Sequence, residues 1–385
     1  MTVRKHLSLD VRVNPPVAPV SEDYVEVSVA LTIRGQDLVE EAPHPAQVIG
    51  VLVGEPPADV LDSLANDLGI VFLDGDGQLK PAAEITQPVT TLSAGLGRFS
   101  QWIEGSGAED CHLFLFVSTS TLENGDRLGE RVEALRNLDV RADIFGTRHM
   151  LDYRLLGQVA LMCGGRFYVG ADRWCQDATL CLERQRSRRF FKGRLGISLT
   201  SNLIPVSAFR LDPAPLHVRD FQVQPTNEMC WFDLPVMGSP QDETIWLLRC
   251  LAPRRKSGEY RILDYQVMGQ TSGSPITMSG TISQSASASP SASSHIDAVV
   301  EVYVDRTRAA HWVETVGQAY VRGDGGKIVS TFGPFMQHES LNGRPDNVQR
   351  LWSLKGELIR GGYFGLKELN TMWCLAQSIE LEPPG

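Results

Sequence analysis

The sequence predicts an α/β protein with a three-layer domain around a mostly parallel sheet, followed by a β-sandwich and C-terminal helices. Residues 48–53 and 113–117 are continuous apolar runs, as expected for strands that a parallel sheet buries on both faces. Apolar runs of this kind alternate with segments of helical spacing between residues 48 and 169, which indicates repeated β-α units. From residue 194 onwards, shorter alternating segments separated by Pro- and Gly-rich turns indicate the sandwich.

The first two strands are predicted at residues 7–13 and 24–34, where apolar and polar residues alternate on either side of Asn14-Pro15-Pro16. This alternation predicts strands that are open to solvent on one face. In the α/β part, strands are expected at 48–53, 70–73, 113–117, 140–145 and 166–169. The intervening helices are expected at 58–68, 92–103, 127–137 and 151–162.

In the second half of the chain, strands are predicted at 195–199, 245–248, 260–263 and 298–304. The Ser- and Ala-rich segment 283–294 has low complexity and is predicted to be a mobile hairpin loop. The tail is predicted to form helices over 306–321 and 345–378, around a break that contains Gly and Pro.

Composition excludes several classes of protein. A formal charge of −10 over 385 residues disfavours nucleic acid and anionic membranes as general partners, because they carry charge of the same sign. The N-terminus lacks an apolar signal core, and no run of about 18 apolar residues occurs, so a cytoplasmic location is expected. The seven cysteines include no Cys-x-x-Cys pair and are expected to be reduced and mostly buried.

Three segments resemble the von Willebrand factor A (VWA) fold. The apolar run 48–53 is followed by a polar turn, and the run 113–117 leads into a polar loop from Ser118 to Asp126. Most specific is the stretch 156–160 that leads through Cys163-Gly164-Gly165 into the last strand. The resemblance implies that residues 7–31 pair with 194–304 in one sandwich. The domains expected are 1–43 (N-terminal strands), 44–185 (VWA-like), 186–305 (sandwich) and 306–385 (helical).

The resemblance also implies that the family's metal-ion-dependent adhesion site is degenerate. Metal-binding members carry Asp-x-Ser-x-Ser after the first strand, a Thr from a second loop and an Asp after the fourth strand, which are the oxygen ligands that Mg²⁺ prefers. The second loop aligns near residues 92–97, without a Thr at its glycines. The corresponding degenerate positions are Gly54, Glu55, Pro56, Ala58, Ser118 and Thr119.

We therefore expect a non-enzymatic scaffold or adaptor without metal or cofactor. The resemblance implies protein partners in a bacterial multi-protein system, such as an AAA+ ATPase, a kinase or other subunits. Two alternatives stay open at the carboxyl edge of the sheet, where open α/β sheets bind ligands. One is a metal-dependent binder that uses Glu55 and Ser118. The other is an enzyme whose candidate residues are Glu55, Asp74, Ser118 and Thr119.

Other motifs favour structural interpretations. Residues 74–78 begin like a calcium loop but lack its later Gly and Glu, so a strand-end turn is predicted. Residues 95–100 are one residue short of Gly-x-Gly-x-x-Gly, which favours a close-packed helix entry. Cys111 and His112 are adjacent on a strand and therefore point to opposite faces, which prevents a nucleophile pair.

A basic run joins the α/β and β-rich parts and is interpreted either as a solvated connector or as a docking stripe for an acidic partner. Its members are Arg184, Arg186, Arg188, Arg189, Lys192 and Arg194. The tail is rich in aromatic residues, which are expected to pack onto the body or to form an exposed anchor for another subunit. These are Trp312, Tyr320, Trp352, Tyr363, Phe364 and Trp373.

Overall fold

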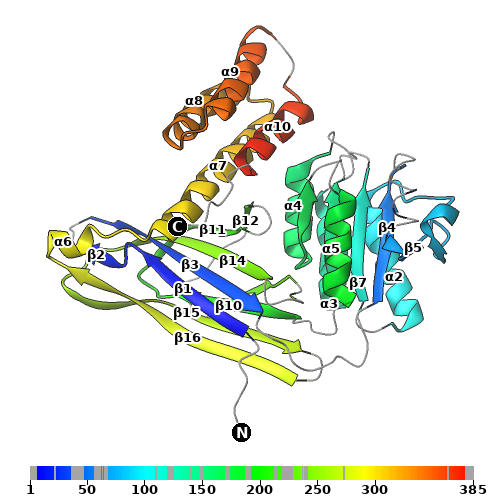
Figure 1. Ribbon diagram of the computed structural model, residues 1–385, viewed down its shortest axis with the longest axis horizontal. Helices are drawn as coiled ribbons and strands as arrows, with labels where there is room; N and C mark the ends of the chain where they lie inside the picture. The colour runs from blue at the N-terminus through cyan, green and yellow to red at the C-terminus, as the bar shows by residue number, and fades with distance from the viewer. Residues whose placement is uncertain are drawn as a thin grey trace.

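A computed structural model describes residues 7–377, apart from 21–22, 36–46, 56–61, 63, 65–67, 109–110, 119–124, 139, 147–150, 170–173, 187–191, 212–214, 219–228, 236, 238–241, 272–273 and 362–363. The described residues form a six-stranded sheet in an α/β unit, two five-stranded sheets in a sandwich, and a group of C-terminal helices (Figure 1). The α/β class predicted from the sequence is confirmed. No helix in the described ranges has both the length and the apolar character that a membrane span needs.

The α/β unit is built on a sheet in the order β6-β5-β4-β7-β8-β9. Every neighbouring pair is parallel except β5 and β6, which form an antiparallel hairpin at one edge. Every residue of β7 and of β8 is buried, as expected for central strands of a parallel sheet that is covered on both faces. The strands are β4 (Gln47–Val53), β5 (Val71–Leu73), β6 (Leu79–Pro81), β7 (Cys111–Val117), β8 (Arg141–Gly146) and β9 (Phe167–Val169).

Helices cover both faces of this sheet and give the predicted three layers. Helices α2 (Leu92–Ser106), α3 (Gly125–Asn137) and α4 (Tyr153–Met162) pack on the face that carries Leu113 and Leu115. Helix α5 (Trp174–Arg186), which was not predicted, packs on the face of Phe114 and Phe116. A 3-10 turn, η2 (Ala82–Glu84), follows β6. The helix predicted at 58–68 falls largely outside the described residues.

The sandwich combines strands from both ends of the chain. In the first sheet, β1 (Leu7–Asn14) pairs with β3 (Val25–Gly35), and β3 pairs on its other edge with a strand that comes about 200 residues later. That sheet continues through β14 (Glu243–Ala252), β11 (Ile204–Arg210) and β12 (Leu216–His217). The second sheet runs in the order β13 (Cys230–Asp233), β10 (Lys192–Leu199), β15 (Gly258–Thr271), β16 (Ser274–Ser287) and β2 (Val17–Pro19).

The prediction that the second N-terminal strand is open to solvent on one face is wrong. All residues of β3 from Val27 to Ile33 are buried. Val29 and Leu31 face the interior of the sandwich, whereas Ala30 packs with Val300 and Val304 of helix α7 (Ala298–Val321) on the other face. An alternating pattern reflects the local sequence, so it cannot predict burial by a helix that comes about 270 residues later in the chain.

Three predictions of secondary structure in the second half of the chain are also wrong: the strand at 298–304, the loop at 283–294 and the break in the tail. Residues 298–304, predicted as a strand, open helix α7, because the Asp297 carboxylate accepts from the backbone N–H groups of Val299 and Val300. The boundary expected between residues 305 and 306 therefore lies inside this helix. The segment predicted as a loop at 283–294 contains the end of β16 and the short helix α6 (Pro290–Ser293).

The predicted break in the tail is a helix, α8 (Gly325–Leu341), which contains Pro334. Its buried face carries Phe332 and Phe335, so packing outweighs the poor helix propensity of its Gly and Pro residues. It is followed by α9 (Pro345–Ile359) and α10 (Leu366–Gln377). In Figure 1, α7 leads from the sandwich to the other three helices.

The Cys163-Gly164-Gly165 turn joins the α/β unit to the sandwich. A Cβ atom on Gly165 would lie 1.8 Å from the backbone oxygen of Ala142 on β8, and only glycine permits that approach. Gly164 has φ 62°, and a Cβ there would lie 2.7 Å from Cβ of Asp233 on β13. Arg210 Nη2 on β11 donates to the Gly165 carbonyl at 2.5 Å. Both sheets of the sandwich thus contact this turn.

At the same junction, the carboxylate of Asp233 forms ion pairs with three arginines. Its Oδ1 lies 2.9 Å from Nε of Arg194 and 3.3 Å from Nη2 of Arg141. Its Oδ2 accepts from Nε of Arg136 on α3 at 3.1 Å. We call Asp233 with these three arginines the junction cluster. One buried carboxylate therefore joins β13, β10, β8 and α3.

Substituting Gly165 with Ala tests whether the close approach holds the junction together. Because the added methyl group would meet backbone rather than a movable side chain, Gly165→Ala should lower the free energy of unfolding by about 3 kcal/mol. Urea denaturation followed by circular dichroism measures this difference. Gly129→Ala in α3 is the matched control, since a Cβ there meets nothing within 4 Å, and it should be neutral or stabilising. Equal stability of the two variants would contradict the assignment.

Candidate functional site

The candidate site is the carboxyl edge of the parallel sheet. Gly54 follows β4 directly, is buried and has φ 78°, a conformation that favours glycine. Its backbone N–H donates to the carbonyl of Val89 at 2.6 Å, and the N–H of Val89 donates to Leu52 at 3.0 Å. Gly54, which was predicted to correspond to the Asp of the metal site, is therefore held in a left-handed turn by the segment that leads into α2.

Ser118, at the end of β7, is 3% exposed. Its hydroxyl donates to the carbonyl of Val53 at 3.1 Å, and its backbone N–H donates to the same oxygen at 2.9 Å. The side chain thus ties the ends of β4 and β7 together. Glu55 is exposed at this edge. The other three predicted positions, Pro56, Ala58 and Thr119, lie outside the described residues.

Asp74, the remaining candidate for the enzyme alternative, is a structural carboxylate. Its Oδ2 lies 2.5 Å from Nζ of Lys80, and its Oδ1 accepts from the backbone N–H groups of Gly75 and Gln87 at 2.8 and 2.9 Å. Burial opposes its ionisation, but Lys80 and the two N–H groups hold the pKa of Asp74 well below its usual range. The strand-end turn predicted for residues 74–78 is confirmed by the hydrogen bond from Gly77 N to Asp74 O at 2.9 Å.

A buried His–Asp pair, which was not predicted, lies at the opposite, amino edge of the sheet. His112 Nε2 is 3.1 Å from Oδ2 of Asp143, whose Oδ1 accepts from the backbone N–H of Arg166 at 2.6 Å. Burial opposes ionisation, yet His112 and Arg166 lower the pKa of Asp143. Both side chains are 3% exposed, so the pair is structural. The pair could be predicted only from the register of β7 and β8, which places the two residues near each other.

The basic run does not form one stripe in the described residues. Arg184 and Arg186 belong to the last turn of α5, and Lys192 and Arg194 lie on β10. Arg194 is part of the junction cluster and thus has a structural role. Arg188 and Arg189, and the side chains of Arg184 and Arg186, lie outside the described residues.

Most of the described aromatic residues in the tail pack inside it. Phe364 and Trp373 are each 7% exposed, and Trp312 packs against Phe335 and His338. Trp352 on α9 is different, with 59% of its surface exposed. Tyr363 lies outside the described residues.

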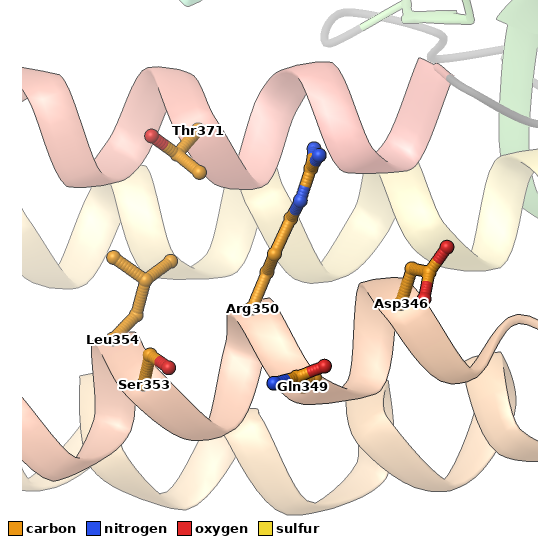
Figure 2. Close-up of a pocket in the computed structure, with 6 residues that line it drawn as sticks. All are labelled: Asp346, Gln349, Arg350, Ser353, Leu354 and Thr371. Carbon is orange, nitrogen blue, oxygen red and sulfur yellow. The ribbon is translucent and has the colours of Figure 1, made fainter.

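A groove of about 490 Å³ lies between α9 and α10. Figure 2 shows Arg350 extending from α9 toward α10, with Leu354 and Ser353 one turn further along α9. Asp346 lies near one end of the groove, so the groove carries charge of both signs. This balance of charge does not define a ligand class.

The donor set limits the chemistry of the described residues. Among them, no three His, Cys, Asp or Glu side chains lie close enough together to hold a metal ion. At the carboxyl edge the described positions offer a glycine backbone, a hydroxyl engaged with a carbonyl, and the carboxylate of Glu55. A hard cation such as Mg²⁺ requires about six oxygen ligands in near-octahedral geometry.

No protein-family profile matches the sequence, and no curated protein matches it as a relative. The fold is that of von Willebrand factor type A proteins, as two solved structures show. A von Willebrand factor type A protein from Catenulispora acidiphila matches with a TM-score of 0.64 at 13% identity, covering 91% of both chains. The ArnB paralog VWA2 from Sulfolobus acidocaldarius matches with a TM-score of 0.52 at 12% identity, covering 97% of this chain and 99% of that one. The predicted VWA resemblance is confirmed, whereas loss of the metal site stays a prediction.

The Asp74 network gives a pH-dependent prediction. Because the folded-state pKa is depressed below the usual value of 3.8, the stabilisation is complete above pH about 3.8 and is lost as the pH falls toward the folded-state pKa. Asp74→Asn should lower the free energy of unfolding at pH 7 by about 1–3 kcal/mol, because Lys80 loses its charged partner. Its stability should then fall less than that of wild type between pH 4 and about pH 2.

Denaturant titrations at several pH values measure both effects. Asp76→Asn is the control, since Asp76 also pairs with Lys80 but its side chain is 46% exposed. A much smaller change is expected for it, because solvent screens an exposed pair. If the two variants behaved alike, burial of Asp74 would not be the cause.

Proposed function

We propose that this chain is a non-enzymatic, metal-independent protein-interaction module that serves as a scaffold or adaptor. The single observation that carries the proposal is that Gly54, directly after β4 at the carboxyl edge of the parallel sheet, is in a left-handed turn and has no side chain that could hold a metal ion. The VWA fold is consistent with a protein-interaction role. Binding would then depend on shape, apolar contacts and protein charges.

The surroundings of two of the four candidate catalytic residues support a non-enzymatic role. Asp74 is neutralised by Lys80, and the hydroxyl of Ser118 is buried against a carbonyl. General acid–base or nucleophilic catalysis requires a group that can reach a substrate and exchange a proton with it. Neither side chain meets that requirement in this arrangement. The partners we propose are protein subunits of a multi-protein system, such as an AAA+ ATPase or a kinase.

Metal titration tests the metal-independent part. Calorimetric titration of the purified chain with Mg²⁺, Mn²⁺ and Ca²⁺ should show no saturable binding at submillimolar concentration, because the described residues of the edge do not provide a set of oxygen donors. Glu55→Ala is the matched variant and should give the same trace as wild type. Micromolar binding that disappears in Glu55→Ala would instead support the metal-dependent alternative.

Partner capture tests the interaction role. The full chain, used as bait in extract from its native cell, should retain the same stoichiometric protein partner in buffer with Mg²⁺ and in buffer with EDTA. Quantitative mass spectrometry compares the two conditions. Loss of the partner in EDTA would contradict metal independence, and failure to retain any stoichiometric partner in either buffer would contradict the scaffold role.

A further inference from the structure

A cleft of about 400 Å³ lies between α2 and α3. One end is formed by Thr91, which lies two residues after Val89, the residue that bonds the backbone of Gly54. The cleft therefore opens beside the carboxyl edge of the sheet. We call it the α2–α3 cleft.

Two arginines line this cleft. Arg131 of α3 lies across the backbone of α2, since a Cβ added to Gly97 would come within 2.9 Å of its Nε and 3.0 Å of its Cζ. Arg98 of α2 makes one long hydrogen bond, from Nη1 to the backbone oxygen of Asp74 at 3.5 Å. Each guanidinium has five N–H donors, and within the described residues Arg131 makes no hydrogen bond or ion pair.

The rest of the lining is small or polar. Ala94 and Gly97 add no polar side-chain atom, Ser93 adds a hydroxyl and Gln101 adds an amide. Glu130 is the acidic residue of the lining, so two positive charges face one negative charge. The N-terminus of α2 is capped by its own Thr91, whose hydroxyl accepts from Ala94 N at 3.1 Å. The arginines, and not the helix terminus, define the site.

We propose that the α2–α3 cleft binds a carboxylate of an acidic segment in a protein partner. Guanidinium and carboxylate form bidentate, charge-assisted hydrogen bonds, and Arg131 is exposed, so an Asp or Glu side chain of a partner can reach it. The cleft is a positive site on a chain of net charge −10, so the attraction is short-range and sensitive to salt. The inference rests on the proposed interaction role and specifies the chemistry of the partner.

Substituting Gly97 tests the proposal without removing any charge. In Gly97→Ala the new methyl group displaces the end of the flexible Arg131 side chain, while alanine favours the helix, so the fold is retained. Gly105→Ala in the same helix is the matched control, because a Cβ there meets nothing within 4 Å. Arg131→Gln removes the charge directly. Thermal melts of all three variants verify that each is folded.

The probes are a fluorescent, N-acetylated hexaglutamate peptide and a hexaglutamine peptide of the same length, followed by fluorescence anisotropy at low salt. Hexaglutamate should bind, and hexaglutamine should bind at least about tenfold more weakly. Gly97→Ala and Arg131→Gln should each weaken hexaglutamate binding about tenfold, and Gly105→Ala should leave it unchanged. Added salt should weaken binding in wild type.

Equal affinity for the two peptides would overturn the proposal, and so would unchanged hexaglutamate affinity in Gly97→Ala and Arg131→Gln. Complete displacement of hexaglutamate by millimolar inorganic phosphate would also overturn it, because it would indicate a general anion site. The proposed interaction role is tested separately by partner capture in EDTA. If capture succeeds and is unaffected by Gly97→Ala and Arg131→Gln, the cleft assignment fails while the interaction role stands.

Discussion

The contact between the Gly164-Gly165 turn and the sandwich is the constraint on which the arrangement of the molecule depends. Gly165 brings the backbone of the turn against β8 where no side chain fits, and Arg210 reaches from the sandwich to hold its carbonyl. Because Arg141 is the first residue of β8, the contact is made at the amino edge of the parallel sheet. The carboxyl edge, where ligands of open α/β sheets bind, is the opposite end.

The junction cluster adds ion pairs to this contact. These ion pairs contribute more to the choice of one orientation of the α/β unit on the sandwich than to the free energy of unfolding. A buried carboxylate and a buried guanidinium each lose hydration, and their attraction offsets this loss only when the geometry is good. Here one carboxylate serves three arginines from three different elements, at 2.9–3.3 Å. A shifted orientation of the two units would leave Asp233 or Arg141 buried without a partner. The cluster therefore selects one orientation of the α/β unit on the sandwich.

The sequence predicted most of the α/β unit because its signals are local. The runs 48–53 and 113–117 are apolar since both faces of β4 and β7 are covered, and Cys163-Gly164-Gly165 is specific because two glycines satisfy steric demands there. Errors occurred where a distant element decides the outcome. The face of β3 that should be open is covered by α7, and the Val-rich start of α7 alternates like a strand but is set by the Asp297 cap.

The candidate site was predictable in kind but not in detail. The place of Gly54 at the sheet edge could be predicted because it directly follows a buried apolar run. The hydrogen bond from Ser118 to Val53 could not be predicted without the knowledge that β4 and β7 are neighbours. The α2–α3 cleft had no sequence signal, because Gly97 and Arg131 are 34 residues apart and meet only when the two helices pack. The basic run, in contrast, was conspicuous in the sequence, and Arg194 within it serves the junction.

The strand order of the sandwich has a consequence for how the protein is made. The α/β unit is inserted between β3 and β10, so β3 is synthesised long before β14, the strand that pairs with its second edge. β1 and β3 can pair with each other and local β-α units can form as they emerge, but the second edge of β3 stays unpaired for roughly 200 further residues, or some tens of seconds of synthesis. During that interval the apolar stretch from Val27 to Ile33 has no covering sheet or helix. Until β14 is made, β3 therefore presents an apolar strand with an unpaired edge, which is the kind of segment that is prone to aggregation.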